Sequence, residues 1–144
     1  MSINYSVDLR LKAVFNEEKV GLILQKGKDI GFIYYDHICG ERYSTSPVLN
    51  VNDATRKMLD YSEEIVSDGG PNIWTKFEDT YFTLWIREYE KGFIDVFIAG
   101  TSYPWKKDFW NGAVDHGFDF ARYIRLLLKL CEDFTIVEVR TSAD

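Results

Sequence analysis

The amino-acid sequence predicts an α+β fold, with an antiparallel sheet of about six or seven strands and two α-helices at about 53–68 and 116–133. The C-terminal helix is expected to pack across the sheet. Three patterns predict this fold: polar–apolar alternation in residues 5–13, two strand-like runs joined by a glycine turn in residues 80–101, and helical apolar spacing in residues 116–133. A chain of 144 residues is the size of one domain, and we take residues 1–144 as a single domain.

The N-terminal part of the chain predicts an antiparallel meander. In residues 5–13 the odd-numbered side chains are apolar and the even-numbered ones are polar, which is the pattern of a half-buried strand. A second, more apolar strand is expected from Val20 to Gln25, followed by a turn over residues 26–29. A third strand is expected from Ile30 to Tyr35.

A helix is predicted after a loop-like stretch at residues 40–51, in which Val48 to Val51 can form a short strand. Asn52 or Asp53 is an acceptable N-cap, and the sequence Gly-Gly-Pro at 69–71 is a strong stop signal. The apolar residues that recur on one face are Ala54, Met58, Tyr61 and Ile65. Basic residues in the first turns and acidic residues near the end oppose the expected helix dipole.

Residues 80–101 predict a hairpin whose loop is Glu90-Lys91-Gly92, with glycine at the left-handed position. The resulting register pairs Tyr89 with Phe93, Arg87 with Asp95, Trp85 with Phe97, Ile86 with Val96, and Leu84 with Ile98. One face of the hairpin is aliphatic and belongs to the core. The other is aromatic, with an opposite-charge pair, and is either covered by a helix or open to a ligand or partner.

The segment at residues 102–114 follows the hairpin and breaks every periodic pattern. Its aromatic residues are Tyr103, Trp105, Phe109 and Trp110. A long aromatic connection is either functional or fixed over the core by its own rings. The helix at 116–133 has a narrow polar stripe, which indicates deep packing, and a final strand is expected from Thr135 to Arg140.

Cysteine usage and the N-terminal sequence predict a cytoplasmic protein. Cys39 and Cys131 stand alone among apolar neighbours, as buried free thiols do in a reducing compartment. The first residues lack the pattern of a secretion signal, and no apolar run approaches the ~20 residues of a membrane span.

No motif in the chain points to catalysis, a cofactor or a metal. Asp115, His116 and Asp119 form a possible ligand group, but a helix N-cap and a favourable first-turn carboxylate explain the same residues. His37 and Cys39 would share a strand face, but nothing nearby supplies the oxyanion donors that a thiolate nucleophile needs. We therefore expect a non-catalytic protein without a cofactor.

The charge distribution points to a basic protein partner. The formal net charge is −6, which argues against direct nucleic-acid binding. Residues 60–95, with 9 acidic and 3 basic residues, carry the whole imbalance. A solvated acidic face would explain this segment equally well. Carboxylates that lie together can instead steer association with a basic surface, and tryptophans are frequent interface anchors. The candidate partner-binding residues are Glu78, Asp79, Glu88, Glu90, Asp95, Trp74, Trp105 and Trp110.

Small size, the acidic segment and its interleaved aromatic residues Trp74, Tyr81, Trp85 and Tyr89 give the chain a resemblance in type to a class of bacterial inhibitors. It resembles the small acidic immunity proteins that protect bacteria from their own secreted toxins, including those of contact-dependent inhibition. The resemblance implies one dedicated toxin as partner, neutralised by electrostatic and steric occlusion, and no catalysis. The alternative is a small-molecule or peptide-binding module that uses the aromatic face of the 80–101 hairpin and the 102–114 loop.

Overall fold

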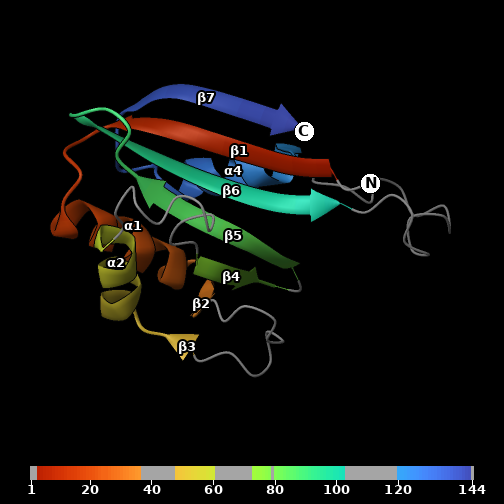
Figure 1. Cartoon of the computed structure of the whole chain (residues 1–144), viewed down its shortest axis with the longest axis horizontal. Helices are drawn as coiled ribbons and strands as arrows, with labels where there is room; N and C mark the ends of the chain where they lie inside the picture. The colour runs from red at the N-terminus through yellow and green to blue at the C-terminus, as the bar shows by residue number, and fades with distance from the viewer. Residues whose placement is uncertain (1–2, 37–47, 61–72, 79, 103–119, 144) are drawn as a thin grey trace, which may run out of the picture.

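The computed structural model describes residues 3–36, 48–60, 73–78, 80–102 and 120–143. It confirms the α+β class. A seven-stranded antiparallel sheet has the order β3-β2-β4-β5-β6-β1-β7 (Figure 1). The strands are β1 (Ile3–Lys12), β2 (Ile33–Tyr35), β3 (Val48–Leu49), β4 (Ile73–Phe77), β5 (Thr80–Arg87), β6 (Phe93–Ser102) and β7 (Ile136–Ala143). The helices are α1 (Glu17–Asp29), α2 (Val51–Leu59) and α4 (Phe120–Leu130).

The predicted hairpin register is confirmed for four of its five pairs, from Leu84↔Ile98 to Arg87↔Asp95 in the β5–β6 ladder. The ladder ends at Arg87, so it does not include the predicted pair of Tyr89 with Phe93. Gly92 adopts φ 89°, the left-handed conformation that glycine accepts without strain. Leu84, Ile86 and their partners on β6 are buried, as expected for the aliphatic face. An alternation of aliphatic residues with aromatic or charged residues on both sides of a short turn therefore specified the pairing from local sequence alone.

The predicted strand at Val20–Gln25 and the turn at 26–29 are wrong, because residues 17–29 form the single helix α1. The Asn16 side chain caps this helix by accepting a hydrogen bond from the backbone N–H of Lys19 at 2.8 Å. Acidic residues occupy its first turn and basic residues its last, the order that the helix dipole favours. The predicted meander is therefore absent: β1 pairs with β6 and β7, and β2 pairs with β3 and β4.

The strand predicted from Ile30 to Tyr35 is present as β2, but it is shorter than predicted. Ile30 caps α1, and Gly31 turns the chain with φ 112°, so β2 begins only at Ile33. The helix predicted at 53–68 begins earlier and ends earlier, as α2 from Val51 to Leu59, with Asn50 rather than Asn52 or Asp53 as N-cap. Its Asp53 lies in the first turn and its basic residues in the last, so the expected conflict with the dipole does not arise within α2. Residues 61–72 lie outside the described part of the chain.

The C-terminal helix packs across the sheet, as predicted, in contact with β1 and β6. Its described part is α4, and residues 116–119 lie outside the described residues. Tyr123, Leu126, Leu127 and Leu130 are buried, whereas Leu128 is exposed. Cys131 is buried as predicted, and burial raises the pKa of its thiol to about 12. Cys39 lies outside the described residues.

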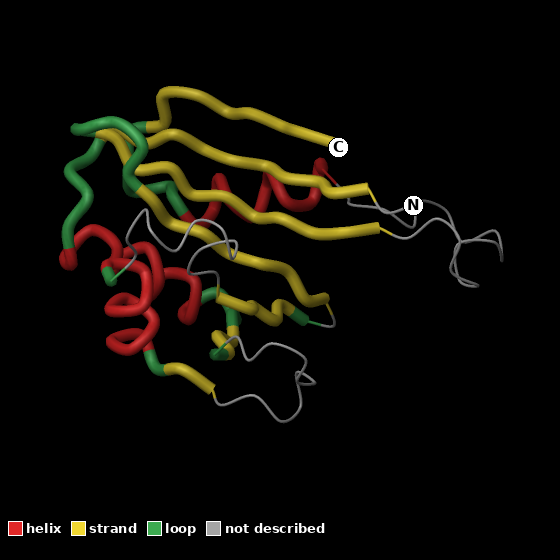
Figure 2. The backbone as a smooth tube through the Cα atoms, viewed as in Figure 1, coloured by secondary structure: helices red, strands yellow, loops and turns green. Residues whose placement is uncertain are grey.

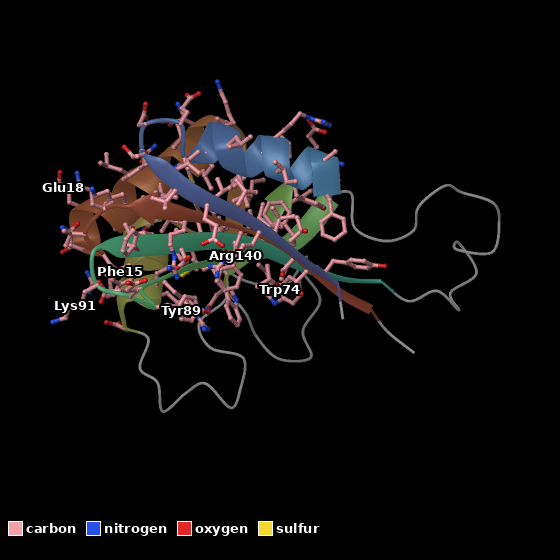
Figure 3. The ribbon with its side chains drawn as sticks, turned by 90° about the horizontal axis from the view of Figure 1, so that it is seen from above. Phe15, Glu18, Trp74, Tyr89, Lys91 and Arg140 are labelled. Carbon is pink, nitrogen blue, oxygen red and sulfur yellow. The ribbon has the colours of Figure 1, made fainter. Side chains whose placement is uncertain are left out.

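The sheet has two unlike faces. The side chains that point toward α1 and α4 form one hydrophobic core, which α2 joins by packing against α1. Figure 3 shows α4 and α1 on one side of the sheet, with Trp74, Tyr89 and Arg140 on the other. We call that other side the second face. Alternation and register assign it Ser6, Asp8, Arg10, Trp74, Lys76, Trp85, Arg87, Asp95, Phe97, Glu138, Arg140 and Ser142. Within the described ranges, no helix is long and apolar enough to cross a membrane.

Candidate functional site

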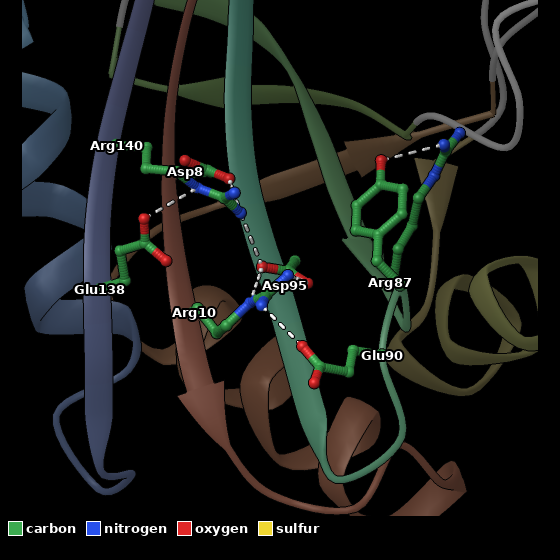
Figure 4. Close-up of polar contacts among 8 residues, drawn as sticks. Asp8, Arg10, Arg87, Glu90, Asp95, Glu138 and Arg140 are labelled. Atoms are coloured by element: carbon green, nitrogen blue, oxygen red, sulfur yellow. Dashed lines mark hydrogen bonds and ion pairs between the residues drawn. The ribbon is translucent and has the colours of Figure 1, made fainter.

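A group of charged side chains crosses three neighbouring strands on the second face, as Figure 4 shows. At its centre is Asp95 of β6, whose side chain is 0% exposed. Arg10 of β1 donates to its carboxylate through Nε at 3.1 Å, and Arg140 of β7 donates through Nη2 at 3.1 Å. A buried carboxylate is stable only when it is paired and hydrogen-bonded, and the two guanidinium groups meet that need.

Three further carboxylates surround these two arginines. Asp8 lies 2.9 Å from Arg140 Nη2, and Glu138 lies 3.8 Å from Arg140 Nε. Glu90, on the hairpin loop, lies 3.0 Å from Arg10 Nη1. We call the six residues the arginine–carboxylate cluster. Two guanidinium groups against four carboxylates leave it with a formal charge of −2.

The cluster is one wall of a cavity of about 450 Å³. The cavity, here called the second-face pocket, is lined by Ser6, Asp8, Arg10, Tyr89, Phe97, Arg140, Thr141 and Ser142. Its volume falls in the range typical of small-ligand sites. Of the cluster, only Asp8, Arg10 and Arg140 line this hollow. One carboxylate, two guanidinium groups, hydroxyl groups and two aromatic rings therefore converge there.

Aromatic side chains from the hairpin form the other wall. Tyr89 is 58% exposed and stacks on Phe97, with ring centroids 6.5 Å apart and an interplanar angle of 21°. Phe97 in turn lies 4.9 Å from Trp85, and the Arg87 guanidinium sits 3.6 Å from the Trp85 ring centroid. Arg87 also donates to the Tyr89 hydroxyl at 3.3 Å. These contacts hold Tyr89 in place while leaving much of its ring accessible.

Asp8 carries an electrostatic cost in this position. Burial raises the pKa of its carboxyl above the usual value, an effect larger than the opposing attraction of Arg140. Asp95 and Glu138 raise it further by repulsion. The charged form of Asp8 is thus less favourable in the folded chain than in water.

The predicted partner-binding carboxylates do not gather on one surface. Glu78 lies at the turn between β4 and β5, with φ 57°, and pairs with Arg122 at 3.4 Å. Glu88 and Glu90 lie at the opposite end of β5, about 20 Å away at the usual rise of a strand. Asp79 lies outside the described residues.

Asp95 is fully buried and therefore cannot contact a partner, although it was among the predicted partner-binding residues. The register correctly places it opposite Arg87, but its ion pairs are with Arg10 and Arg140 on the other side of β6. Trp74 lies on the second face and is partly buried (Figure 3). Trp105 and Trp110 lie outside the described residues, as do the 103–119 segment, His37, and the Asp115–His116–Asp119 group.

Sequence reasoning missed Asp8, Arg10 and Arg140 as site residues. The alternation in residues 5–13 already placed Asp8 and Arg10 on one side of a strand, where they could be taken for solvent-facing residues. Only the pairing of β1 with both β6 and β7 brings them beside Asp95 and Tyr89.

A second cavity, of about 530 Å³, lies between α1, the end of β1 and the turn after α4. Its charged lining residues are Lys12, Lys19, Lys26, Asp29 and Asp133. Lys26 is already paired with Glu132 at 2.5 Å. This cavity therefore shows less chemistry directed toward a ligand than the second-face pocket does.

Comparison of the chain with protein-family models, curated proteins and solved structures finds no match in any of the three. The second-face pocket therefore has to be judged from its own chemistry: an accessible aromatic ring beside the Asp8 carboxylate and two guanidinium groups that are paired with carboxylates of the same chain.

Proposed function

We propose that this protein is a non-catalytic binding protein that recognises a basic partner at the second-face pocket. The observation that carries the proposal is the exposed ring of Tyr89 beside the arginine–carboxylate cluster, whose formal charge is −2 and whose Asp8 carboxylate lines the same hollow. Lysine and arginine side chains are the protein groups that match both features. They are cations, and they also stack on aromatic faces.

The geometry supports insertion of such a side chain rather than a flat surface contact. The apolar stem of a lysine or arginine can lie along Tyr89 and Phe97, while its charged end approaches Asp8. A cation over an exposed tyrosine contributes about 0.5–1 kcal/mol, and more where water is excluded.

The charges around the pocket favour a cationic ligand over an anionic one. The two arginines are held by carboxylates of the same chain, so an anionic ligand would compete with these carboxylates for the guanidinium groups and would be repelled by them. A cationic group does not compete for the guanidinium groups. The balance of contacts favours a basic partner over an acidic one.

We extend the proposal to an immunity protein, which the resemblance in type implies. The partner would be a basic, nuclease-like toxin, and the second face would occupy the surface with which the toxin holds phosphate. The second-face pocket, rather than the acidic 60–95 segment, supports this proposal, because the described carboxylates of that segment are spread apart. Cytoplasmic location and a bacterial source belong to the same proposal.

The test is a pull-down from native cell lysate with matched charge variants, at low salt and at about 0.5 M salt, which screens exposed charge. Wild type should retain one basic protein at low salt and less of it at high salt. Asp8→Asn and Tyr89→Ala should lose it. Glu18→Gln, which removes an exposed carboxylate on α1, should retain it. Equal retention by wild type and Asp8→Asn would place the interaction elsewhere.

Inhibition is tested separately from binding. The retained protein is purified and assayed for nuclease activity with the wild-type chain and with Tyr89→Ala. The immunity proposal expects wild type to suppress the activity and Tyr89→Ala to suppress it less. Binding without any suppression would contradict occlusion.

A second candidate function is a small-molecule or peptide-binding module, favoured by the volume of about 450 Å³ and the aromatic wall of the same pocket. Capped single amino acids distinguish the two. A module for small cations would show saturable binding of a capped arginine alone, whereas a protein-docking surface would need the larger partner for measurable affinity.

A further inference from the structure

Strand β7 is an exposed border of the sheet. It pairs with β1 along one side, and it stands last in the strand order, so in the described part of the chain its other side carries no strand. Every residue from Val137 to Ser142 is exposed. Figure 2 shows β7 as the outermost yellow strand. A long edge strand of this kind presents backbone N–H and C=O groups that can pair with another strand.

The exposed valines distinguish this edge from a purely polar one. Val137 is 53% exposed and Val139 is 45% exposed. Natural sheets commonly protect an edge with lysine, proline or a bulge. Here β7 contains no lysine or proline, and its one irregularity is a bulge at Val137, which has no partner on β1 because Leu11 pairs with Ile136 and Arg10 with Glu138. The strand from Glu138 onward is regular.

The sequence of β7 is self-complementary in one register. If two copies pair antiparallel about Val139, Glu138 lies opposite Arg140 of the second copy, and Arg140 lies opposite Glu138 of the second copy. Centring the pair on Glu138 would oppose two glutamates, and centring it on Arg140 would oppose two arginines. Because like charges directly opposite are destabilising and unlike charges stabilising, the charge pattern selects Val139 as the centre.

The same register also pairs the apolar side chains. Val139 meets Val139 of the second copy, and Val137 meets Thr141 of the second copy. Directly opposite β-branched residues are favourable cross-strand pairs. Charge and apolar contacts therefore agree on a single arrangement.

We propose that a second copy of this chain docks on β7 as an antiparallel strand centred on Val139. The sheet then continues across the two copies. The interface is one strand wide, at the small end of specific interfaces, so the dimer dissociates on dilution. This inference uses the backbone edge of β7, and its charge argument draws on Glu138 and Arg140 of the arginine–carboxylate cluster. It does not require the function proposed for the second-face pocket, because its test is the oligomeric state.

Sedimentation equilibrium over a range of protein concentrations tests the proposal. The wild-type mass should rise from 16.8 kDa toward twice that value as concentration increases. Val139→Lys places two positive charges at the centre and should weaken association about tenfold or more. Val48→Lys, at an exposed valine on the opposite edge strand, is the matched control and should associate like wild type.

A wild-type chain that keeps its monomer mass at every concentration would overturn the proposal. So would a dimer that Val139→Lys and Val48→Lys affect equally, or a monomeric chain whose β7 pairs with an extended peptide of another protein.

The register is tested by cross-linking in a Cys39→Ser background. Opposed residues of an antiparallel pair have Cα atoms about 4.5–5.5 Å apart, within reach of a disulfide. Val139→Cys should therefore form a disulfide dimer under mild oxidation. Val137→Cys and Thr141→Cys chains should cross-link with each other more than either does with itself. Preferential self-cross-linking of Val137→Cys would refute the Val139-centred register.

Discussion

The two glycines of α1 give a sharp test of how this helix packs. A Cβ atom on Gly27 would overlap Tyr34 Oη and come within 2.8 Å of Phe32 Cδ2. Tyr34 is fully buried and donates a hydrogen bond to the Leu24 carbonyl at 2.7 Å. Gly27→Ala must therefore displace the Tyr34 side chain from its place in the core.

The size of the effect follows from these contacts. Overpacking a core costs about 1–3 kcal/mol, and an unsatisfied buried hydroxyl costs about 1–3 kcal/mol. Alanine regains about 1 kcal/mol of helix propensity. We expect Gly27→Ala to lower the free energy of unfolding by about 2–4 kcal/mol, which corresponds to roughly 5–15 °C in Tm.

Gly21 in the same helix provides the control, since its added Cβ would meet only Thr55 Oγ1, at an ordinary 3.7 Å. Gly21→Ala should therefore raise the free energy of unfolding by about 0.5–1 kcal/mol. Urea unfolding of the two variants and wild type, followed by circular dichroism, measures both. A Gly27→Ala protein as stable as wild type would refute the packing of α1 on Tyr34.

Three further predictions concern the second face and the core. Burial raises the pKa of the Asp8 carboxyl in the folded chain, so the free energy of unfolding should fall as pH rises from the unfolded-state pKa through the folded-state pKa. Asp8→Asn should therefore be at least as stable as wild type at pH 7, as measured by urea unfolding. The same variant should bind the partner less well. Asp95→Ala should lower the free energy of unfolding by about 3 kcal/mol, because Arg10 and Arg140 lose the buried carboxylate that they share. Glu90→Ala should change the free energy of unfolding by less than about 1 kcal/mol, because its ion pair is exposed. In a Cys39→Ser chain, Cys131 should react with a thiol reagent only as fast as the protein unfolds, since it is buried and its thiol pKa is raised to about 12; rapid labelling under native conditions would contradict this burial.

Local patterns predicted the hairpin well and α1 badly. The hairpin was predictable because its register depends on residues a few positions apart around Gly92. In α1 two glycines and a run of apolar residues suggested a strand and a turn. The helical signal was nevertheless present: Val20, Ile23, Leu24 and Gly27 recur at helical spacing and are buried, and Asn16 precedes two acidic residues.

The candidate site was only half predictable. The hairpin pattern correctly showed aromatic residues and Asp95 on one face, and it suggested a binding role for that face as an alternative. It could not show which strands lie on the other side of β6. Residues 10 and 140 reach Asp95 only through the long-range order β6-β1-β7, which no local pattern encodes.

NMR tests whether the second-face pocket receives a cationic group. A ¹⁵N-labelled protein is titrated with a capped tri-arginine peptide and, as charge control, with a capped tri-glutamate peptide. We expect saturable shifts at the pocket residues, Tyr89 and Arg140 among them, with tri-arginine only, and their loss in Tyr89→Ala. Shifts centred on the cavity beside Lys26, or an equal response to tri-glutamate, would contradict it.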